Sequence, residues 1–311
     1  MDVIRRIENV VWARQRRKLP ALVRDWPDKY KIKGCMRLYK KRMGYRFDFN
    51  HPTLFTEKLQ CYKLLYDSPD FPDAVDKYLF KSYIERRLGE GYTIPLCGAW
   101  ETVEGFLGAW ESLPDEVVLK STLQSDGKFI RIIRDRSAVD LDELAAEVRE
   151  WLKPEKTLIN SYCRAYYKAT PRILAERYMA QMDDDQLYDY KAFCFDGKPH
   201  CFYVATDHFP GQLSHISFYD LNWNRLDVRY GEHPNCDVAK PKHFAEMLDI
   251  AQRLSEGIPF VRVDFFEAED RPLLSEMTFY PGGGQTPFHP ESFNRELGDL
   301  FVLPERKNFG L

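Results

Sequence analysis

Apolar residues recur every three or four positions in several stretches of the chain, and breaks containing proline or glycine separate these stretches. This spacing predicts helices, because it places apolar side chains on one helix face. Residues 3–46 form the first such region, interrupted at Pro20 and Pro27, since proline lacks the amide hydrogen that a helix interior requires. A second periodic run covers residues 56–66. The N-terminal part of the chain is therefore predicted to be helical.

Further helices are predicted downstream. One is capped by Asp76 and stopped by the Gly-Glu-Gly sequence at residues 89–91, because aspartate accepts hydrogen bonds from the first free amides and glycine tolerates a helix end. A short strand is expected to run from this stop into Pro95. The other helices cover residues 141–152 and 242–257, where apolar positions again follow a helical period.

Short apolar or alternating runs between the helices predict β-strands. Asp196-Gly197 lies between two such runs and is typical of a tight hairpin turn. Because several runs follow one another without an intervening helix, antiparallel pairing and an α+β fold are favoured over a doubly wound sheet. The runs cover residues 116–120, 129–134, 172–178, 189–207 and 259–266, with a further strand around Glu276.

The composition indicates a globular protein from a reducing compartment. With 311 residues, 44% of them hydrophobic and 30% charged, the chain is long enough for two lobes. No apolar run approaches the roughly 20 residues of a membrane span, and no signal-peptide pattern is present. The seven cysteines form no Cys-x-x-Cys pair and the seven histidines form no zinc-hydrolase pattern. A cytoplasmic location is predicted, and zinc chemistry is disfavoured.

Positive charge is concentrated at the N-terminus. Residues 1–46 contain 15 lysines and arginines against 4 aspartates and glutamates, a net charge of +11 in a chain whose net charge is -3. Such a segment either attracts an anionic surface, such as the inner face of a membrane or an acidic glycan, or docks on the acidic remainder of the same chain. Nucleic acid is a less suitable partner, because no nucleic-acid-binding module is recognisable.

Near the C-terminus, two short apolar runs flank a charged turn, and each run carries a carboxylate. Asp264 lies on the first run and Glu276 on the second, so a hairpin would place them side by side. Arg262 lies two residues before Asp264 and therefore on the same strand face. Carboxylates beside an arginine, followed by Pro281 and a glycine run, suit Mg²⁺ and nucleotide phosphates. The alternative is a surface hairpin with scattered charges.

Further charged residues occupy strand ends and a helix start. Lys120 ends an apolar strand before a polar loop, and Lys77 lies in the first turn of a predicted helix. Glu176 ends another strand, where a carboxylate could contact a ribose or an adenine. Asp189 and Lys191 lie two residues apart on one strand face. One could reach a ribose and the other a phosphate, or the two could form a structural ion pair.

In this order, the residues resemble the ATP-grasp superfamily. Its members carry an Asp-Lys helix start, a phosphate-binding lysine before a mobile loop, and a hinge glutamate. They end with an Arg-x-Asp strand, a Glu-x-Asn strand and a Pro-Gly turn. Thr278 stands where the superfamily usually has asparagine, and a hydroxyl is a different metal ligand from an amide carbonyl. The matching residues are Lys77, Lys120, Glu176, Arg262, Asp264, Glu276, Pro281 and Gly282.

The chain is more similar to one branch, the TupA-like ATP-grasp proteins, which are named for teichuronopeptide biosynthesis. The resemblance rests on FTEKLQCYKLLYD, DYKAFCFDGKP, FYDLNWN and EMTFYPGGG, within residues 45–300. It implies an ATP-grasp fold with two α+β lobes that clamp ATP, preceded by a basic helical segment. The expected divisions are the helical segment at residues 1–70, the first lobe at 71–175 and the second, metal-binding lobe at 176–311.

The resemblance also implies a reaction. A carboxylate–amine ligase would use ATP and Mg²⁺ to form an acyl phosphate, which an amine then converts to an amide. The implied substrates are an amino acid or similar amine and a bacterial surface polysaccharide or its precursor. The alternatives are a phosphotransferase, a glycosyltransferase of polysaccharide biosynthesis and a non-catalytic nucleotide-binding module.

The site residues that the resemblance implies fall into three groups. Arg262 and Lys191 are the expected catalytic residues, and Asp264, Glu276 and Thr278 are the expected metal ligands. Outside the groups, His289 either faces a substrate or hydrogen-bonds within its own loop. The expected nucleotide contacts are Lys77, Lys120, Ser125, Gly127, Glu176, Tyr178 and Asp189.

Overall fold

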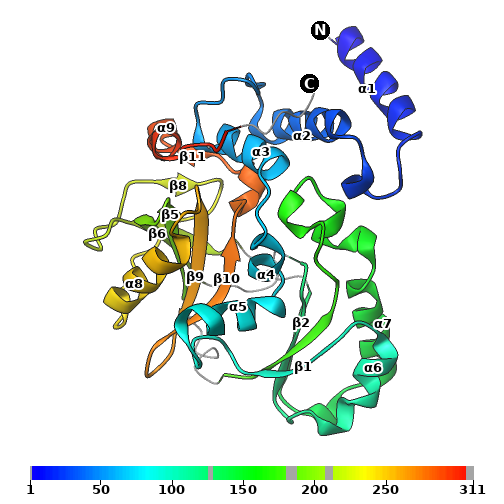
Figure 1. Ribbon diagram of the computed structural model, residues 1–311, viewed down its shortest axis with the longest axis vertical. Coiled ribbons are helices and arrows are strands. Elements are labelled where there is room, and N and C mark those ends of the chain that lie inside the picture. Colours follow the sequence, from blue (N-terminus) through cyan, green and yellow to red (C-terminus); the bar gives the residue numbers. More distant parts are fainter. Residues whose placement is uncertain (1, 125–128, 180–187, 207–212, 306–311) are drawn as a thin grey trace.

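The computed structural model describes residues 2–124, 129–179, 188–206 and 213–305 and contains two main sheets with helices around them (Figure 1). The first sheet has the strand order β1-β4-β2-β3. Its strands are β1 (Leu96–Trp100), β2 (Val117–Ser121), β3 (Ile130–Ile133) and β4 (Ile173–Arg177). Helices α6 (Val103–Gly108) and α7 (Leu141–Trp151) bury one face of this sheet, so side chains such as Leu119 and Ala175 lie in a core. Alternate residues, including Lys120 and Glu176, therefore face the other side.

The second sheet has the strand order β10-β9-β5-β6-β7. Every pairing between neighbouring strands of the two main sheets is antiparallel. This confirms the predicted α+β class, and the hairpin turn at Asp196-Gly197 is also confirmed. The strands are β5 (Asp189–Phe195), β6 (Lys198–Thr206), β7 (His215–Tyr219), β9 (Val261–Glu267) and β10 (Pro272–Thr278).

The two faces of the second sheet have different coverings. Helix α8 (Phe244–Ser255) packs on one face, where Phe244 contacts Phe202. Helices α3 (Phe55–Leu65) and α9 (Glu291–Leu300) lie on the other side, where Phe55 contacts Phe193 and Phe260. A two-stranded sheet, β8 (Arg229–Tyr230) with β11 (Phe288–His289), adds to this second covering. The charged residues considered below lie on this side.

Helices α4 (Phe71–Val75) and α5 (Leu79–Leu88) lie between the two sheets in Figure 1. The buried carboxylate of Asp76 accepts a hydrogen bond from the Tyr78 amide at 2.9 Å and pairs with Arg172 at 2.9 Å, which fixes the start of α5. Phe71 and Phe80 pack in the core of the second sheet, although they fall in the segment expected to form the first lobe. The expected division between residues 175 and 176 falls inside β4.

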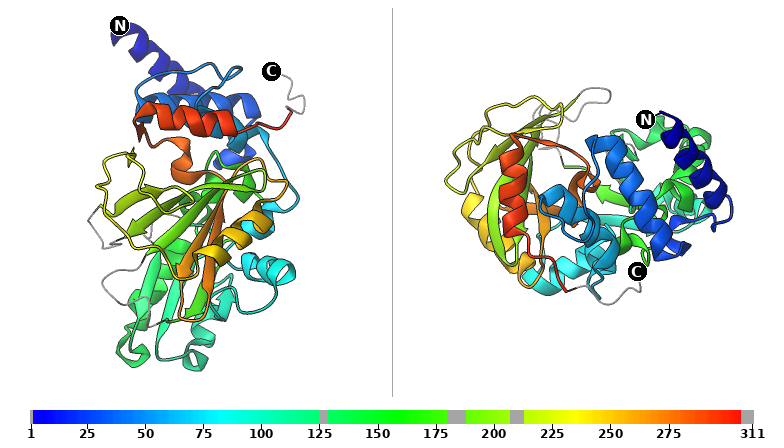
Figure 2. Two further views of the ribbon diagram at one scale, coloured as in Figure 1. Left: turned by 90° about the vertical axis from the view of Figure 1, so that its left-hand side faces the viewer. Right: turned by 90° about the horizontal axis from the view of Figure 1, so that it is seen from above.

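The basic N-terminal segment forms α1 (Asp2–Arg16) and α2 (Asp28–Met43), as its periodicity predicted. Helix α2 docks on the rest of the chain, where Asp28 pairs with Arg164 at 3.1 Å. Helix α1 extends from one end of the molecule (Figure 2). Trp12 and neighbouring residues in the last two turns of α1 contact other residues of the N-terminal segment, such as Trp12 with Trp26.

Two details differ from the sequence-based expectations. The strand expected to end at Pro95 instead begins after it. The carbonyl of Pro95 accepts a hydrogen bond from the amide of Arg177, and the pairing with β4 continues from there to Trp100. Strands β7, β8 and β11 and helices α4, α6 and α9 were not predicted. None of the helices in the described part of the chain combines the length and apolar character of a membrane-crossing segment.

Candidate functional site

A row of charged residues crosses three adjacent strands of the second sheet. Lys191 in β5 is the Cα partner of Asp264 in β9, and Asp264 is the partner of Glu276 in β10. Register partners project from the same face of a sheet. The three groups therefore lie together, and Asp264 stands opposite Glu276 as the hairpin pattern predicted.

This alignment depends on an irregularity in β10. Leu274 pairs with Phe265, but the next pair is Glu276 with Asp264, so one residue of β10 is left without a partner. In an unbroken ladder, Glu276 would stand opposite Val263, whose side chain points to the other face. The bulge at Ser275 thus brings the second carboxylate to the functional face.

Arg262 binds both carboxylates of this row. Its Nε and Nη2 atoms lie 2.7 and 2.5 Å from the two carboxylate oxygens of Asp264, and Nη2 lies 3.1 Å from Glu276. Lys191 donates to Asp264 at 2.8 Å and also contacts Asp189. Burial raises the pKa of Asp264 to about 6, although Arg262 and Lys191 act in the opposite direction. Two cations thus hold a fully buried carboxylate, as burial of a charge requires.

Lys77 adds a further cation to the row. Its Nζ atom lies 3.4 Å from Glu276 and donates to the carbonyl oxygen of Gln124 at 3.1 Å. Burial raises the pKa of Glu276, but the charges of Lys77 and Arg262 outweigh this effect and hold that pKa well below its ordinary range. Glu276 is therefore ionised at neutral pH.

A second charged cluster lies on the first sheet. Glu176 in β4 is buried, with Lys120 2.6 Å from one carboxylate oxygen and Lys81 of α5 2.5 Å from the other. Burial raises the pKa of Glu176, but the charges of Lys120 and Lys81 outweigh this effect and lower that pKa to about 2. Two lysines around one carboxylate leave a net positive charge suited to phosphate groups.

Lys81 was not among the residues singled out from the sequence. Lys77 and Lys120 were both expected to contact the nucleotide; the structure places Lys81 beside Lys120 and Glu176, and Lys77 beside Glu276. Lys81 lies in a helix rich in charged residues, where a functional lysine looks like a surface one. The usable signal was Glu176 itself, because a carboxylate within an apolar strand needs buried counter-charges.

The remaining expected nucleotide contacts are distributed around these clusters. Tyr178 follows β4 and is buried, with the Arg134 guanidinium 3.9 Å from its ring centroid. Asp189 begins β5, and its Oδ1 atom is buried without a hydrogen-bond partner in the part of the chain that the structure describes. Ser125 and Gly127 lie outside the described residues.

The oxygen donors of the charged row fit a magnesium ion. Asp264 and Glu276 supply carboxylates, and the Thr278 hydroxyl lies 2.9 Å from Glu276. Within the described residues, no group of three or more His, Cys, Asp or Glu side chains could hold a metal by itself. Mg²⁺ commonly binds through one or two carboxylates and completes its shell with water and substrate phosphates. Two carboxylates and a hydroxyl match that requirement.

The glycine run after β10 forms the turn η8 (Pro281–Gly284), in which three successive glycines have φ between 57° and 64°. Two side chains of helix α3 hold this turn by donating hydrogen bonds to the carbonyl groups of the turn. Gln60 donates to Gly284 and the buried Lys63 donates to Gly283, each at 2.7 Å. Neither side chain was singled out from the sequence, because both occupy ordinary positions of a periodic helix. They connect α3 to the end of the strand that carries Glu276.

Comparison with solved structures finds distant likeness. D-alanine–D-alanine ligase from Helicobacter pylori is 13% identical with a TM-score of 0.43, over 74% of this chain and 61% of that chain. D-alanine–D-alanine ligase from Bacillus anthracis complexed with ATP is 16% identical with a TM-score of 0.42, over 74% and 65%. D-cycloserine synthetase DcsG is 17% identical with a TM-score of 0.39, over 67% and 62%. The chain spans less than two thirds of the length of each of these structures.

Comparison at the family level is more decisive. No curated protein sequence matches the chain. The family model described as TupA-like ATPgrasp matches residues 57–302, which include both charged clusters and the glycine turn. The chain therefore belongs to the TupA-like ATP-grasp family.

Proposed function

We propose that this protein is an ATP-dependent ligase that joins a carboxylate to an amine through an acyl phosphate. The observation that carries the proposal is the row of Lys191, Asp264 and Glu276 with Arg262 bound across it, in a chain of the ATP-grasp family. One face of the sheet thus combines ligands for a metal with cations for a phosphorylated carboxylate. Phosphoryl transfer depends mainly on such positioning and charge neutralisation.

We assign Lys81 and Lys120 to the phosphate groups of ATP. Their pairing with Glu176 holds both ammonium groups at one point of the first sheet. Glu176, Tyr178 and Asp189 are assigned to the rest of the nucleotide, as is the segment with Ser125 and Gly127. Support comes from the family and from the convergence of the two lysines.

Asp264, Glu276 and Thr278 would hold Mg²⁺, which when bound supplies positive charge to the ATP phosphates. Arg262 presents a planar guanidinium that can contact two oxygens of one anionic group. Lys191 lies beside it and can orient the carboxylate substrate by a charge-assisted hydrogen bond. These two residues are the proposed catalytic groups.

The substrates that we propose are an amino acid or similar amine and the carboxylate of a surface polysaccharide or its precursor. Support comes from membership of the TupA-like family. The test is a screen of ADP release over amino acids paired with uronic-acid glycans. A ligase should release ADP when both substrates are present, and hydroxylamine should trap the activated carboxylate as a hydroxamate. A stable phosphorylated product formed without an amine would replace this proposal with a kinase.

A matched pair of double variants tests the metal ligands. Asp264→Asn with Glu276→Gln should lower ADP formation on the order of 100-fold or more. Glu269→Gln with Asp270→Asn makes the same charge change in the exposed turn of the same hairpin and should leave the rate unchanged. Normal turnover in the first variant would contradict the assignment.

We also propose that the protein works in the cytoplasm, at the inner face of a membrane, with α1 as the attachment. Val10 and Val11 of α1 are 67% and 45% exposed, and residues 1–46 carry the net charge of +11. An exposed apolar patch on a basic helix suits an anionic lipid surface. The other interpretation of the basic segment, docking on the remainder of the same chain, applies to α2.

A further inference from the structure

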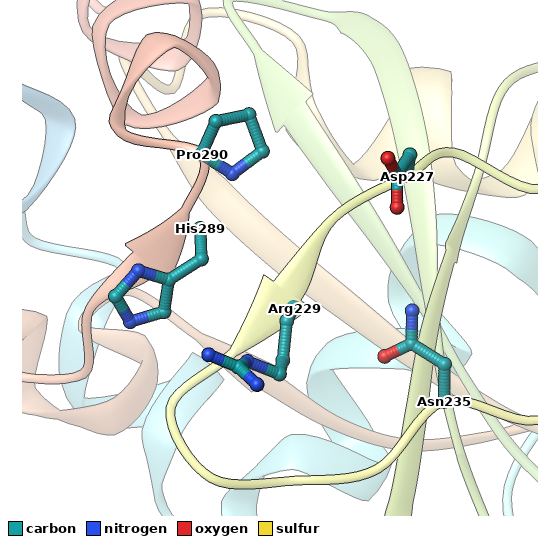
Figure 3. Close-up of a pocket in the computed structure, with 5 residues that line it drawn as sticks. All are labelled: Asp227, Arg229, Asn235, His289 and Pro290. Carbon is teal, nitrogen blue, oxygen red and sulfur yellow. The ribbon is translucent and has the colours of Figure 1, made fainter.

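A pocket of about 410 Å³ lies on the outer side of the two-stranded sheet β8–β11 (Figure 3). Two separate parts of the chain form it, one around β8 and one at the start of α9. The proposed reaction uses none of its residues. The lining residues are Asp227, Arg229, Asn235, His289 and Pro290.

The pairing of β8 with β11 explains why charged groups line this pocket. Tyr230 pairs with Phe288, and Arg229 pairs with His289. Tyr230 and Phe288 are buried with their ring centroids 4.9 Å apart. Since neighbouring residues of a strand point to opposite faces, Arg229 and His289 project together to the exposed side. Two nitrogen donors therefore stand opposite one another at the pocket.

The polar groups of the pocket do not satisfy one another. In the part of the chain that the structure describes, the side chains of Asp227, Arg229 and His289 make no hydrogen bond or ion pair. The neighbouring Arg225, in contrast, pairs with Asp237 at 2.7 Å. The pocket thus holds a cation and an anion that are both available to a ligand.

Asn235 adds an acceptor to this set. Its Nδ2 atom donates to the carbonyl oxygen of Val228 at 3.1 Å, which orients the amide. Its Oδ1 atom is shielded from solvent and has no hydrogen-bond partner in the described part of the chain. A shielded oxygen without a partner is costly, and a ligand donor group would satisfy it.

The pocket also lies close to the proposed reaction site. Tyr230, on the strand that carries Arg229, has its ring centroid 5.6 Å from that of Tyr203. The guanidinium of Arg262 lies 5.7 Å from the centroid of Tyr203. Tyr203 is the partner of Lys191 and shares its face of the sheet. The pocket thus overlies the functional face, with aromatic rings between it and Arg262.

We propose that this pocket binds a part of one substrate in which a carboxylate lies next to a hydrogen-bond donor. The donor is either an ammonium or a hydroxyl group. Arg229 and His289 donate to the carboxylate, and Asp227 and Asn235 accept from the donor. This chemistry is shared by amino acids and uronic sugars. The part of the inference that identifies the ligand as a substrate rests on the proposed function. Because aromatic rings separate the pocket from Arg262, the bound part is a unit of a larger substrate other than the reacting unit, and its binding would orient the reacting end.

Binding without ATP tests the pocket separately from the reaction. Saturation-transfer NMR on the full chain would compare L-alanine with L-alaninol, and D-glucuronate with D-glucuronamide. In each pair the second molecule lacks the carboxylate. One of the two carboxylates should bind, its counterpart without a carboxylate should bind far more weakly, and the pair that responds identifies the source.

The variants Arg229→Gln and Arg225→Gln form a matched pair. Arg229→Gln should weaken binding of the carboxylate about 10-fold or more, because a hydrogen bond to a charged group is lost. Arg225→Gln, in the same loop, should have no effect. Asp227→Asn should weaken binding while leaving the fold, checked by circular dichroism, unchanged.

Several results would overturn the pocket assignment. They are the absence of binding of either carboxylate, equal binding of the counterparts that lack the carboxylate, and unchanged binding in Arg229→Gln. A different outcome is possible if the carboxylate binds in a way that depends on Arg229 but no ATP is turned over. This result would support the pocket and remove the ligase assignment.

Discussion

At the scale of single residues, Glu176 and Asp264 show how the two sheets handle a buried carboxylate differently. Glu176 meets two lysines and has its pKa lowered to about 2. Asp264 meets Arg262 and Lys191, yet its complete burial raises its pKa to about 6. The first arrangement leaves a net positive charge for an anionic ligand, whereas the second includes further carboxylates, Glu276 and Asp189, which balance its cations. Each carboxylate therefore predicts a different response to mutation.

Lys81→Met should weaken ATP binding about 10- to 100-fold, because a charge-assisted hydrogen bond to phosphate would be lost. Lys120→Ala should have a similar effect. Isothermal titration calorimetry with ATP provides the measurement. Lys242→Met is the control, since Lys242 is exposed and donates only to the backbone of Glu269 in the described part of the chain. Equal affinities in all of these variants would indicate that the lysines around Glu176 serve stability alone.

Glu176 should also make stability depend on pH. Its pKa in the folded protein, about 2, lies below the ordinary value of 4.5, so its stabilising effect is present above 4.5 and is lost as pH falls towards 2. The full effect is on the order of 3 kcal/mol. The difference in stability between the wild-type protein and Glu176→Gln, measured by urea unfolding, should be full near pH 6, reduced to about half near pH 3, and nearly lost only towards pH 2. A difference that stays constant over this range would contradict the assigned ion pairs.

At the scale of elements, the contact between α3 and the glycine turn joins the N-terminal helices to the functional face. Gly284 has a φ of 64°, and a Cβ atom there would lie 2.7 Å from the Cβ of Leu59 and 2.5 Å from Gln60 Nε2. Gly283 has a φ of 61°, but a Cβ atom there would meet nothing within 4 Å. Substitution of the two glycines therefore separates the cost of backbone strain from the cost of a close contact.

Gly283→Ala should cost about 1–2 kcal/mol of stability, the cost of a left-handed conformation. Gly284→Ala should cost about 1–3 kcal/mol more, because its side chain would push the turn away from α3. The free energy of unfolding in urea gives these costs, and ADP formation reports the position of the turn. Activity should fall more in Gly284→Ala than in Gly283→Ala under conditions where both remain folded. Equal activities would show that α3 does not position the turn for the reaction.

At the scale of the whole molecule, the basic segment divides into two parts with different roles. Helix α2 belongs to the folded body through contacts such as Asp28 with Arg164. Helix α1 contacts α2 through Trp12, whose ring centroid lies 5.6 Å from the ammonium of Lys33. The folded body should therefore remain when α1 is removed.

Deletion of residues 1–16 should abolish sedimentation with anionic liposomes while the thermal unfolding of the remainder stays cooperative. High salt should release the full-length protein, because the Debye length falls to about 3 Å at 1 M ionic strength. Neutral liposomes serve as the control surface. Liposome binding that persists in the truncated protein would assign the attachment to another surface, and unfolding of that protein would assign a structural role to α1.

The amino-acid sequence by itself determined most elements of this molecule. Helical periodicity located α3, α7 and α8, and the turn residues Asp196-Gly197 located the β5–β6 hairpin. The Arg-x-Asp spacing placed Arg262 and Asp264 on one face. These features are local, because the residues that specify them lie within a few positions of one another and obey fixed periods.

The hairpin pattern predicted that Glu276 lies beside Asp264, but the tertiary structure decided the register that brings them together and which other groups meet. The bulge at Ser275 brings Glu276 opposite Asp264, and a strict alternation would have placed it on the other face. Lys81 reaches Glu176, which the sequence did not predict, and the start of its helix α5 is held by Asp76 pairing with Arg172 from a distant segment. Likewise, the pairing of Arg229 with His289 requires β8 and β11, which lie far apart in the sequence. Contacts of this kind depend on register and packing between distant segments, and no local pattern encodes them.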